Sequence, residues 1–111
     1  MAVKAIEVLE AWRQGFLSGD SAPLSEMLHD DFIFIGPSGN RSKQETLDWV
    51  SSTPDLIQSE SEVLYENDEM FVGIHDIIRS QGRGTAKIMF FARFKDGQVS
   101  YFRVHLVPTG E

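Results

Sequence analysis

The sequence of 111 residues contains no cysteine, which excludes disulfide bridges, thiolate zinc sites and cysteine nucleophiles. It also lacks a long apolar run, since no stretch approaches the roughly 20 apolar residues of a transmembrane helix. The N-terminal segment MAVKAIEVLEAW carries charges every few residues, unlike the apolar core of a secretory signal peptide. These absences predict a cytoplasmic protein with no contact to a membrane.

Basic residues are few and scattered. Ten Lys and Arg are outnumbered by 17 Asp and Glu, which gives a formal net charge of −7. Because nucleic-acid binding needs clustered Lys and Arg to neutralise phosphates, we expect no nucleic-acid partner. Walker, dinucleotide-binding and G-x-S-x-G motifs are also absent, so nucleotide and serine-hydrolase chemistry have no support. Hydrophobic residues still make up 41% of the chain, enough for one domain with a single core over residues 1–111.

The first half of the chain predicts three helices and one short strand. Apolar residues recur at helical spacing over residues 3–18, which predicts an amphipathic helix. A short helix with a proline in its first turn follows over about residues 21–29. A β-prone run at 32–35 ends in the turn sequence GPSG. The sequence SKQE at 42–45 forms a capping box, which predicts a third helix ending before Pro54.

The second half predicts a meander of antiparallel strands. Residues 58–66, 69–79, 84–94 and 98–107 are rich in β-branched and aromatic residues, and turn sequences separate them. Helices followed by a run of strands indicate an α+β fold, with helices packed on one face of a sheet.

Turn positions predict the pairing of these strands. The Asp96-Gly97 turn sets Phe94 opposite Val99, and the loop at 80–83 sets His75 opposite Ile88. In this register Gly73 lies beside Phe90, and Asp76 lies directly across from Lys87.

The same register predicts what each face of the last strand carries. Tyr101, Arg103 and His105 lie at alternate positions, so they share a face, and we expect this face to be the one that carries His75. The apolar alternates Phe102, Val104 and Leu106 are then predicted on the opposite face, with Met89 and Phe91. A single β-bulge would reverse part of this assignment.

Both predicted faces are too apolar to be exposed to water. Three short helices cover only one of them, so we expect the other to form a homodimer through the sheet. The helix-covered face carries the small residues Gly73, Ala86 and Ala92, which predicts a partly hollow pocket beneath the helices.

The run SGDSAPLSEMLHDDFIFIGPSG and the closing FKDGQVSYFRVHLVP resemble the nuclear transport factor 2-like superfamily. This superfamily includes ketosteroid isomerases, SnoaL-like polyketide cyclases and scytalone dehydratase. The resemblance covers nearly the whole chain and implies a single SnoaL-like domain with a cone-shaped, cystatin-like α+β fold. It implies a curved antiparallel sheet packed on three N-terminal helices, a pocket between them, and frequent dimers. It does not imply one reaction, because unrelated functions share the fold.

The resemblance to ketosteroid isomerase argues against that activity in this chain. The oxyanion-binding tyrosine of that enzyme falls on Trp12, its general-base aspartate on Gly36, and its second oxyanion donor near Phe90. None of the three can move a proton next to a carbonyl as the isomerase does.

His75 and His105 are the candidate catalytic residues. In the predicted register they flank Ile88 about 10 Å apart, and two imidazoles at that distance can serve as acid and base. The alternative is that both are hydrogen-bonded residues of the pocket rim. A metal site needs a third ligand, for which Asp31 is the candidate, but no metal-ligand spacing supports one, so we expect no metal and no cofactor.

Tyr101 and Arg103 are candidate ligand-binding residues, because a guanidinium can bind both oxygens of a carboxylate. In the alternative, Arg103 forms an ion pair with a pocket carboxylate such as Asp31, since a buried arginine needs a partner in either case. Asp30 and Asp31 are also consistent with solvated charges.

Five aromatic residues are candidates for both the core and the wall of the pocket. Aromatic residues are most often core, but in the fold that the sequence resembles they commonly line the cavity. These residues are Trp12, Phe16, Phe34, Trp49 and Phe90.

The sequence therefore predicts a small-molecule-binding domain with a mostly apolar pocket, whose ligand carries one polar end. If the protein is an enzyme, cofactor-free proton transfer of the lyase, isomerase or cyclase type is expected. The alternative is a non-catalytic interaction or assembly module that dimerises through its sheet.

Overall fold

Three helices precede most of the strands in the computed structural model, which describes residues 3–37, 39–53, 56–79 and 82–109. The helices are α1 (Ala5–Ser18), α2 (Ala22–Met27) and α3 (Lys43–Ser52). No helix in these ranges is long and apolar enough to cross a membrane. The helix predictions for residues 3–18, 21–29 and the segment after Ser42 are confirmed, with α2 ending two residues early.

Local signals in the sequence fix the ends of two helices. Gly19 follows α1 with φ of 74°, a left-handed conformation that glycine adopts without a Cβ clash. At α3, the Ser42 side chain accepts a hydrogen bond from the Glu45 backbone N–H at 3.2 Å, and the Ser42 backbone N–H donates to Glu45 Oε1 at 2.8 Å. This is the predicted capping box.

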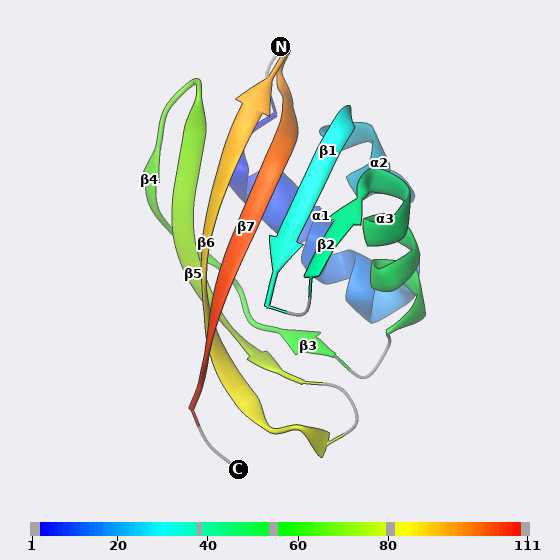
Figure 1. Ribbon diagram of the computed structural model, residues 1–111, viewed down its shortest axis with the longest axis vertical. Coiled ribbons are helices and arrows are strands. Elements are labelled where there is room, and N and C mark those ends of the chain that lie inside the picture. The colour runs from blue at the N-terminus through cyan, green and yellow to red at the C-terminus, as the bar shows by residue number, and fades with distance from the viewer. Residues whose placement is uncertain (1–2, 38, 54–55, 80–81, 110–111) are drawn as a thin grey trace.

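The strands form one seven-stranded sheet within the described residues. They are β1 (Leu28–Gly36), β2 (Gly39–Ser42), β3 (Ile57–Gln58), β4 (Glu62–Glu66), β5 (Met70–Ile78), β6 (Thr85–Lys95) and β7 (Gln98–Pro108). Their order is β2-β1-β7-β6-β5-β3, and β4 also pairs with β5. The sheet curls, and the helices lie on one side of it (Figure 1). The predicted α+β class is confirmed.

The sheet is mixed, not wholly antiparallel as predicted. β1 runs parallel to β7, which is possible because a long stretch of chain connects them and no tight turn imposes opposite directions. The predicted strand at 32–35 is longer and begins at Leu28. The predicted strand at 58–66 is two strands, β3 and β4, and the short β2 was not predicted.

The predicted register between β5 and β6 is correct. His75 pairs with Ile88, and Gly73 pairs with Phe90. Asp76 pairs with Lys87, and their side chains form an ion pair at 3.2 Å. The β5–β6 ladder contains no bulge, so one offset applies to every pair. Residues 80 and 81 of the predicted loop lie outside the described residues.

The predicted register between β6 and β7 is wrong beyond its first pair. Phe94 pairs with Val99 as predicted, but Arg93 pairs with Tyr101, which leaves Ser100 as an extra residue on β7. This bulge shifts the remaining pairs by one and reverses the faces of β7. Phe102 is therefore buried at 3% exposure, while Arg103 is exposed.

The space predicted above Gly73 is filled. A Cβ on Gly73 would lie 2.6 Å from Phe90 Cζ and 2.5 Å from the carbonyl oxygen of Glu62 on β4. Phe90 itself is fully buried, as are Ala86 and Ala92. These small residues admit core side chains and a neighbouring strand, so the hollow part of the fold lies elsewhere.

Candidate functional site

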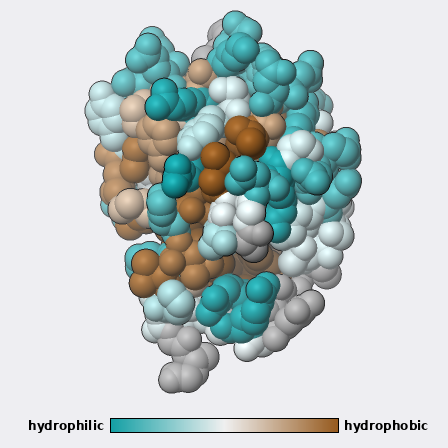
Figure 2. Space-filling model, viewed as in Figure 1, coloured by the Kyte–Doolittle hydropathy of each residue, from teal (hydrophilic) through white to brown (hydrophobic). Residues whose placement is uncertain are grey.

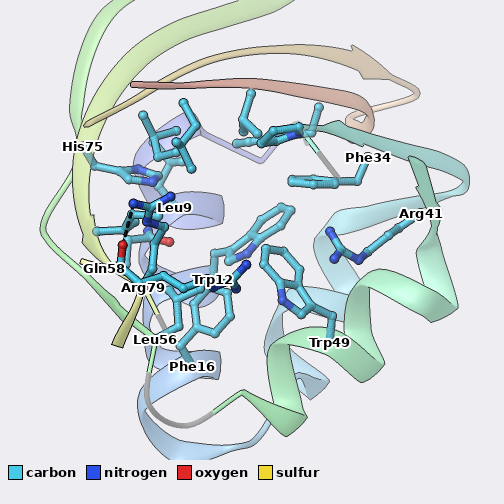
Figure 3. A pocket seen from close by; sticks show the side chains of 17 residues that line it. Leu9, Trp12, Phe16, Phe34, Arg41, Trp49, Leu56, Gln58, His75 and Arg79 are labelled. Atoms are coloured by element: carbon cyan, nitrogen blue, oxygen red, sulfur yellow. Dashed lines mark hydrogen bonds between the residues drawn. The ribbon is translucent and has the colours of Figure 1, made fainter. Parts of the chain in front are cut away.

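A cavity of about 280 Å³ lies between α1, α3 and the concave face of the sheet (Figure 3). Its wall is mostly apolar, with a few polar side chains. The aromatic lining residues are Trp12, Phe16, Phe34, Trp49 and Phe102. The aliphatic ones include Leu9, Leu56, Ile77, Ile88, Val104 and Leu106, and the polar ones are Arg41, Gln58, His75, Arg79 and Arg83.

Helical and strand periodicity bring these residues together. Leu9, Trp12 and Phe16 recur at helical spacing, so they share the face of α1 that packs on the sheet. Phe102 and Val104 alternate along β7 and point to the same side. The cavity is the space that these two faces do not fill.

Aromatic side chains in mutual contact form one wall. The ring of Trp12 lies 4.8 Å from that of Phe102, centroid to centroid. The Trp49 ring lies 5.2 Å from Phe16 in an edge-to-face arrangement and 5.4 Å from Phe34. Such pairs hold each other in place and offer a rigid apolar surface to a ligand.

Arg41 extends this wall with a cation. Its guanidinium carbon lies 4.3 Å from the centre of the Trp49 ring and 5.6 Å from that of Phe34. Burial lowers the pKa of Arg41, and the charge of Glu45 partly opposes this shift. Stacking on an aromatic face leaves the edge of a guanidinium open for hydrogen bonds.

A group of polar side chains lies at the opposite end of the cavity, on β3 and β5. His75, Ile77 and Arg79 alternate along one strand direction, and Gln58 pairs with Ile77. Gln58, His75 and Arg79 therefore lie on one face, as Figure 3 shows. Gln58 is only 7% exposed, and its Nε2 has no hydrogen-bond partner. A buried donor without an acceptor is costly and unusual.

His75 is held in a fixed orientation. Its Nδ1 lies 3.1 Å from Ser61 Oγ, and its ring lies 5.3 Å from that of Phe90. Burial lowers the pKa of His75 to about 4, although the charge of Asp76 opposes the shift. The imidazole is therefore neutral at pH 7, where it can accept a proton.

Five of the predicted site residues line the cavity, namely Trp12, Phe16, Phe34, Trp49 and His75. Their part in binding or catalysis stays a prediction.

Tyr101, Arg103 and His105 do not line the cavity, in contrast to the prediction. They pair with Arg93, Phe91 and Met89 on the outer face of the sheet, and Arg103 and His105 are exposed. The physical reason is the bulge at Ser100, which turns each of them away from the helices.

Asp31 and Phe90 also lie outside the cavity lining. Asp31 is exposed and forms an ion pair with Lys95 at 3.3 Å, so it does not neutralise Arg103. Phe90 is fully buried beneath His75 and belongs to the core.

The polar lining residues Arg41, Gln58, Arg79 and Arg83 were not predicted. Arg79 lies four residues after His75 and therefore on the same face of the strand, so the correctly predicted β5 register could have placed it at the cavity. Arg41 lies on β2, which packs beside α3, and Gln58 lies on β3, which pairs with β5; no local pattern in the sequence indicates either arrangement. Within the described residues, no group of three or more His, Asp or Glu side chains could hold a metal ion.

No protein-family model matches the sequence, and no curated protein matches it significantly. Solved structures do match its fold. One is a nuclear transport factor 2-like protein of unknown function from Cytophaga hutchinsonii, with a TM-score of 0.71 at 14% identity over 97% of this chain and 94% of that chain. A provisionally named isomerase from Rhodopseudomonas palustris gives 0.73 at 15% identity over 97% and 93%. A provisionally named polyketide cyclase from Sinorhizobium meliloti gives 0.72 at 12% identity over 88% and 93%.

Identities this low establish architecture and not activity, because many functions share one fold. The architecture agrees with the resemblance seen in the sequence: this chain has the nuclear transport factor 2-like fold.

Proposed function

We propose that this protein binds a small, mostly apolar molecule with one polar end in the cavity beneath α1. The observation that carries this proposal is the combination of an open aromatic-walled cavity with a buried, unpartnered Gln58 amide. A volume of about 280 Å³ is close to the lower end of the range for ligand sites, which favours a compact ligand.

His75 is the proposed acid-base residue if the bound molecule is also transformed. It lines the cavity, and its low pKa keeps it unprotonated at pH 7, so it would accept a proton. The provisional names of the structural neighbours, an isomerase and a polyketide cyclase, are consistent with cofactor-free proton transfer. The alternative is a non-catalytic module, which would leave the buried Gln58 amide without a function.

Binding can be measured with 4-phenylbutan-1-ol, a neutral probe with an apolar body and one hydroxyl group. Both tryptophans of the chain line the cavity, so both indole N–H resonances in an ¹H–¹⁵N spectrum should shift and saturate on titration. Val104→Phe adds bulk inside the cavity and should abolish the shifts. Val107→Phe is the matched control, because Val107 is 61% exposed on the other face of β7. Unshifted resonances in the unmodified protein would refute the proposal.

We also propose that the protein forms a homodimer through the outer face of the sheet. Met89 is 50% exposed there, and Val72, Ile74 and Phe91 are half-buried beside it. Apolar side chains reach the surface over the strands between hydrophilic ones (Figure 2).

The dimer predicts that Met89→Lys gives a monomer in sedimentation-velocity experiments, because it places a charge among the apolar side chains Val72, Ile74 and Phe91. Phe102, which the sequence placed on this face, is unsuitable for the test because it is core. Gln44→Lys on α3 is the control and should leave the sedimentation coefficient unchanged. A wild-type protein that already sediments as a monomer would contradict the dimer.

A further inference from the structure

The charge of the cavity is opposite to the charge of the protein. The chain carries a formal net charge of −7, yet the described residues that line the cavity include three arginines and no carboxylate. Four of the cations elsewhere form ion pairs within the chain. These pairs are Arg13–Glu10, Lys43–Asp30, Lys87–Asp76 and Lys95–Asp31. Arg41 and Arg79 form no ion pair with a described carboxylate, so their charge is available to a ligand.

The interior end of the cavity presents donors. Gln58 Nε2 is buried and has no acceptor. Arg79 is oriented by two carbonyl groups, since its Nη2 donates to Arg83 at 2.6 Å and its Nε to Gly84 at 3.5 Å. Its Nη1 has no partner among the described residues. Neither donor has an acceptor among the described residues, so a bound ligand can supply one.

The backbone brings these donors together. The Arg79 N–H donates to the Gly84 carbonyl oxygen at 2.8 Å, which continues the β5–β6 ladder past Ile78 and keeps Arg79 on the face of His75. Gln58 pairs with Ile77, the residue between His75 and Arg79. Both are therefore diagonal neighbours of Gln58, at about 7–8 Å between backbones. Side chains of this length can reach a common point in front of Ile77.

We propose that the polar end of the ligand is a carboxylate, which lies between Gln58 Nε2 and the Arg79 guanidinium while the apolar body packs against Trp12, Phe16 and Trp49. This inference rests on the proposed function and specifies its ligand class as small arylalkyl or alkyl monocarboxylic acids. Two carboxylate oxygens offer enough lone pairs for both donors.

Arg41 lies across the cavity from this group, stacked on Trp49 (Figure 3). It contributes positive potential near the aromatic wall and does not contact the carboxylate. This placement separates its expected effect from that of Arg79: loss of Arg41 should weaken binding of the acid only slightly.

The test compares three probes that share a phenylalkyl body: 4-phenylbutanoate, 4-phenylbutanamide and 4-phenylbutyl phosphate. Dissociation constants are measured at pH 7 by calorimetry on the unmodified protein. The acid should bind at least about tenfold more tightly than the neutral amide, the gain typical of a hydrogen bond to a charged group. It should also bind more tightly than the phosphate, whose tetrahedral group is bulkier than a planar carboxylate. Equal affinity for acid and amide, or tighter binding of the phosphate, would overturn the carboxylate assignment and leave the proposed function intact. Absence of binding by all three probes would refute both.

Variants locate the carboxylate. Arg79→Met and Gln58→Leu should each weaken binding of the acid about tenfold while leaving the amide within about twofold. Gln58→Leu replaces an unpartnered buried amide with an apolar group of similar shape, so it should not lower stability and the variant remains testable. Arg103→Met on the outer face is the matched control and should change neither affinity. If Arg41→Met abolishes acid selectivity and Arg79→Met does not, the assignment to the β3–β5 end is wrong.

Discussion

Replacing Phe102 by alanine is expected to lower the free energy of unfolding by about 4 kcal/mol, the typical cost of a Phe→Ala change in a core. Phe102 is 3% exposed, and its ring lies 4.8 Å from Trp12 and 5.5 Å from Phe90. It thus joins α1 to the centre of the sheet. Because it borders the cavity, the space left by the ring merges with existing empty space and does not collapse. Urea unfolding followed by circular dichroism measures the effect.

Arg103→Ala is the matched control, one residue further along β7. Arg103 is exposed on the outer face opposite Phe91, and surface substitutions of this kind change stability by about 0.5 kcal/mol or less. A comparable loss of stability in both variants, or a larger loss for Arg103→Ala, would mean that Arg103 is buried and that β7 has no bulge at Ser100.

The prediction was wrong about which face of the sheet each residue of β7 points to. The Asp96-Gly97 turn correctly places Phe94 against Val99, but one extra residue, Ser100, reverses everything after it. The alternation of Phe102 with Arg103 was the better signal, because burying an unpaired arginine is unfavourable whereas burying a phenylalanine is favourable. A turn determines the pairing only of the residues next to it, whereas the preference of apolar side chains for the interior applies to every residue of the strand.

Features that depend on neighbouring residues were predictable. The α3 capping box follows from four adjacent residues, and the pairing of His75 with Ile88 follows from one loop. The polar end of the cavity was not predictable in this way. Gln58 reaches it on a two-residue strand, which is too short to carry a periodic signal. Its position depends on long-range packing against β5.

The second large effect concerns the dependence of stability on pH. Because burial lowers the pKa of His75 to about 4 in the folded protein, while an unfolded histidine titrates near 6.5, the unfolded state binds the proton more tightly. Above about pH 7 neither state is protonated, so this residue has no effect. As pH falls from about 6.5 to about 4, stability should fall by about 3 kcal/mol, and below that range the loss is constant.

His75→Asn isolates this contribution, because asparagine keeps a polar group near Ser61 Oγ and does not titrate in this range. The free energy of unfolding is measured in urea at several pH values for both proteins, and the quantity compared is the slope with pH. Wild type should lose about 3 kcal/mol more than His75→Asn between pH 7 and pH 4. Parallel slopes for wild type and His75→Asn would mean that the imidazole is hydrated in the folded protein, and the buried, neutral base on which its proposed chemistry depends would not exist.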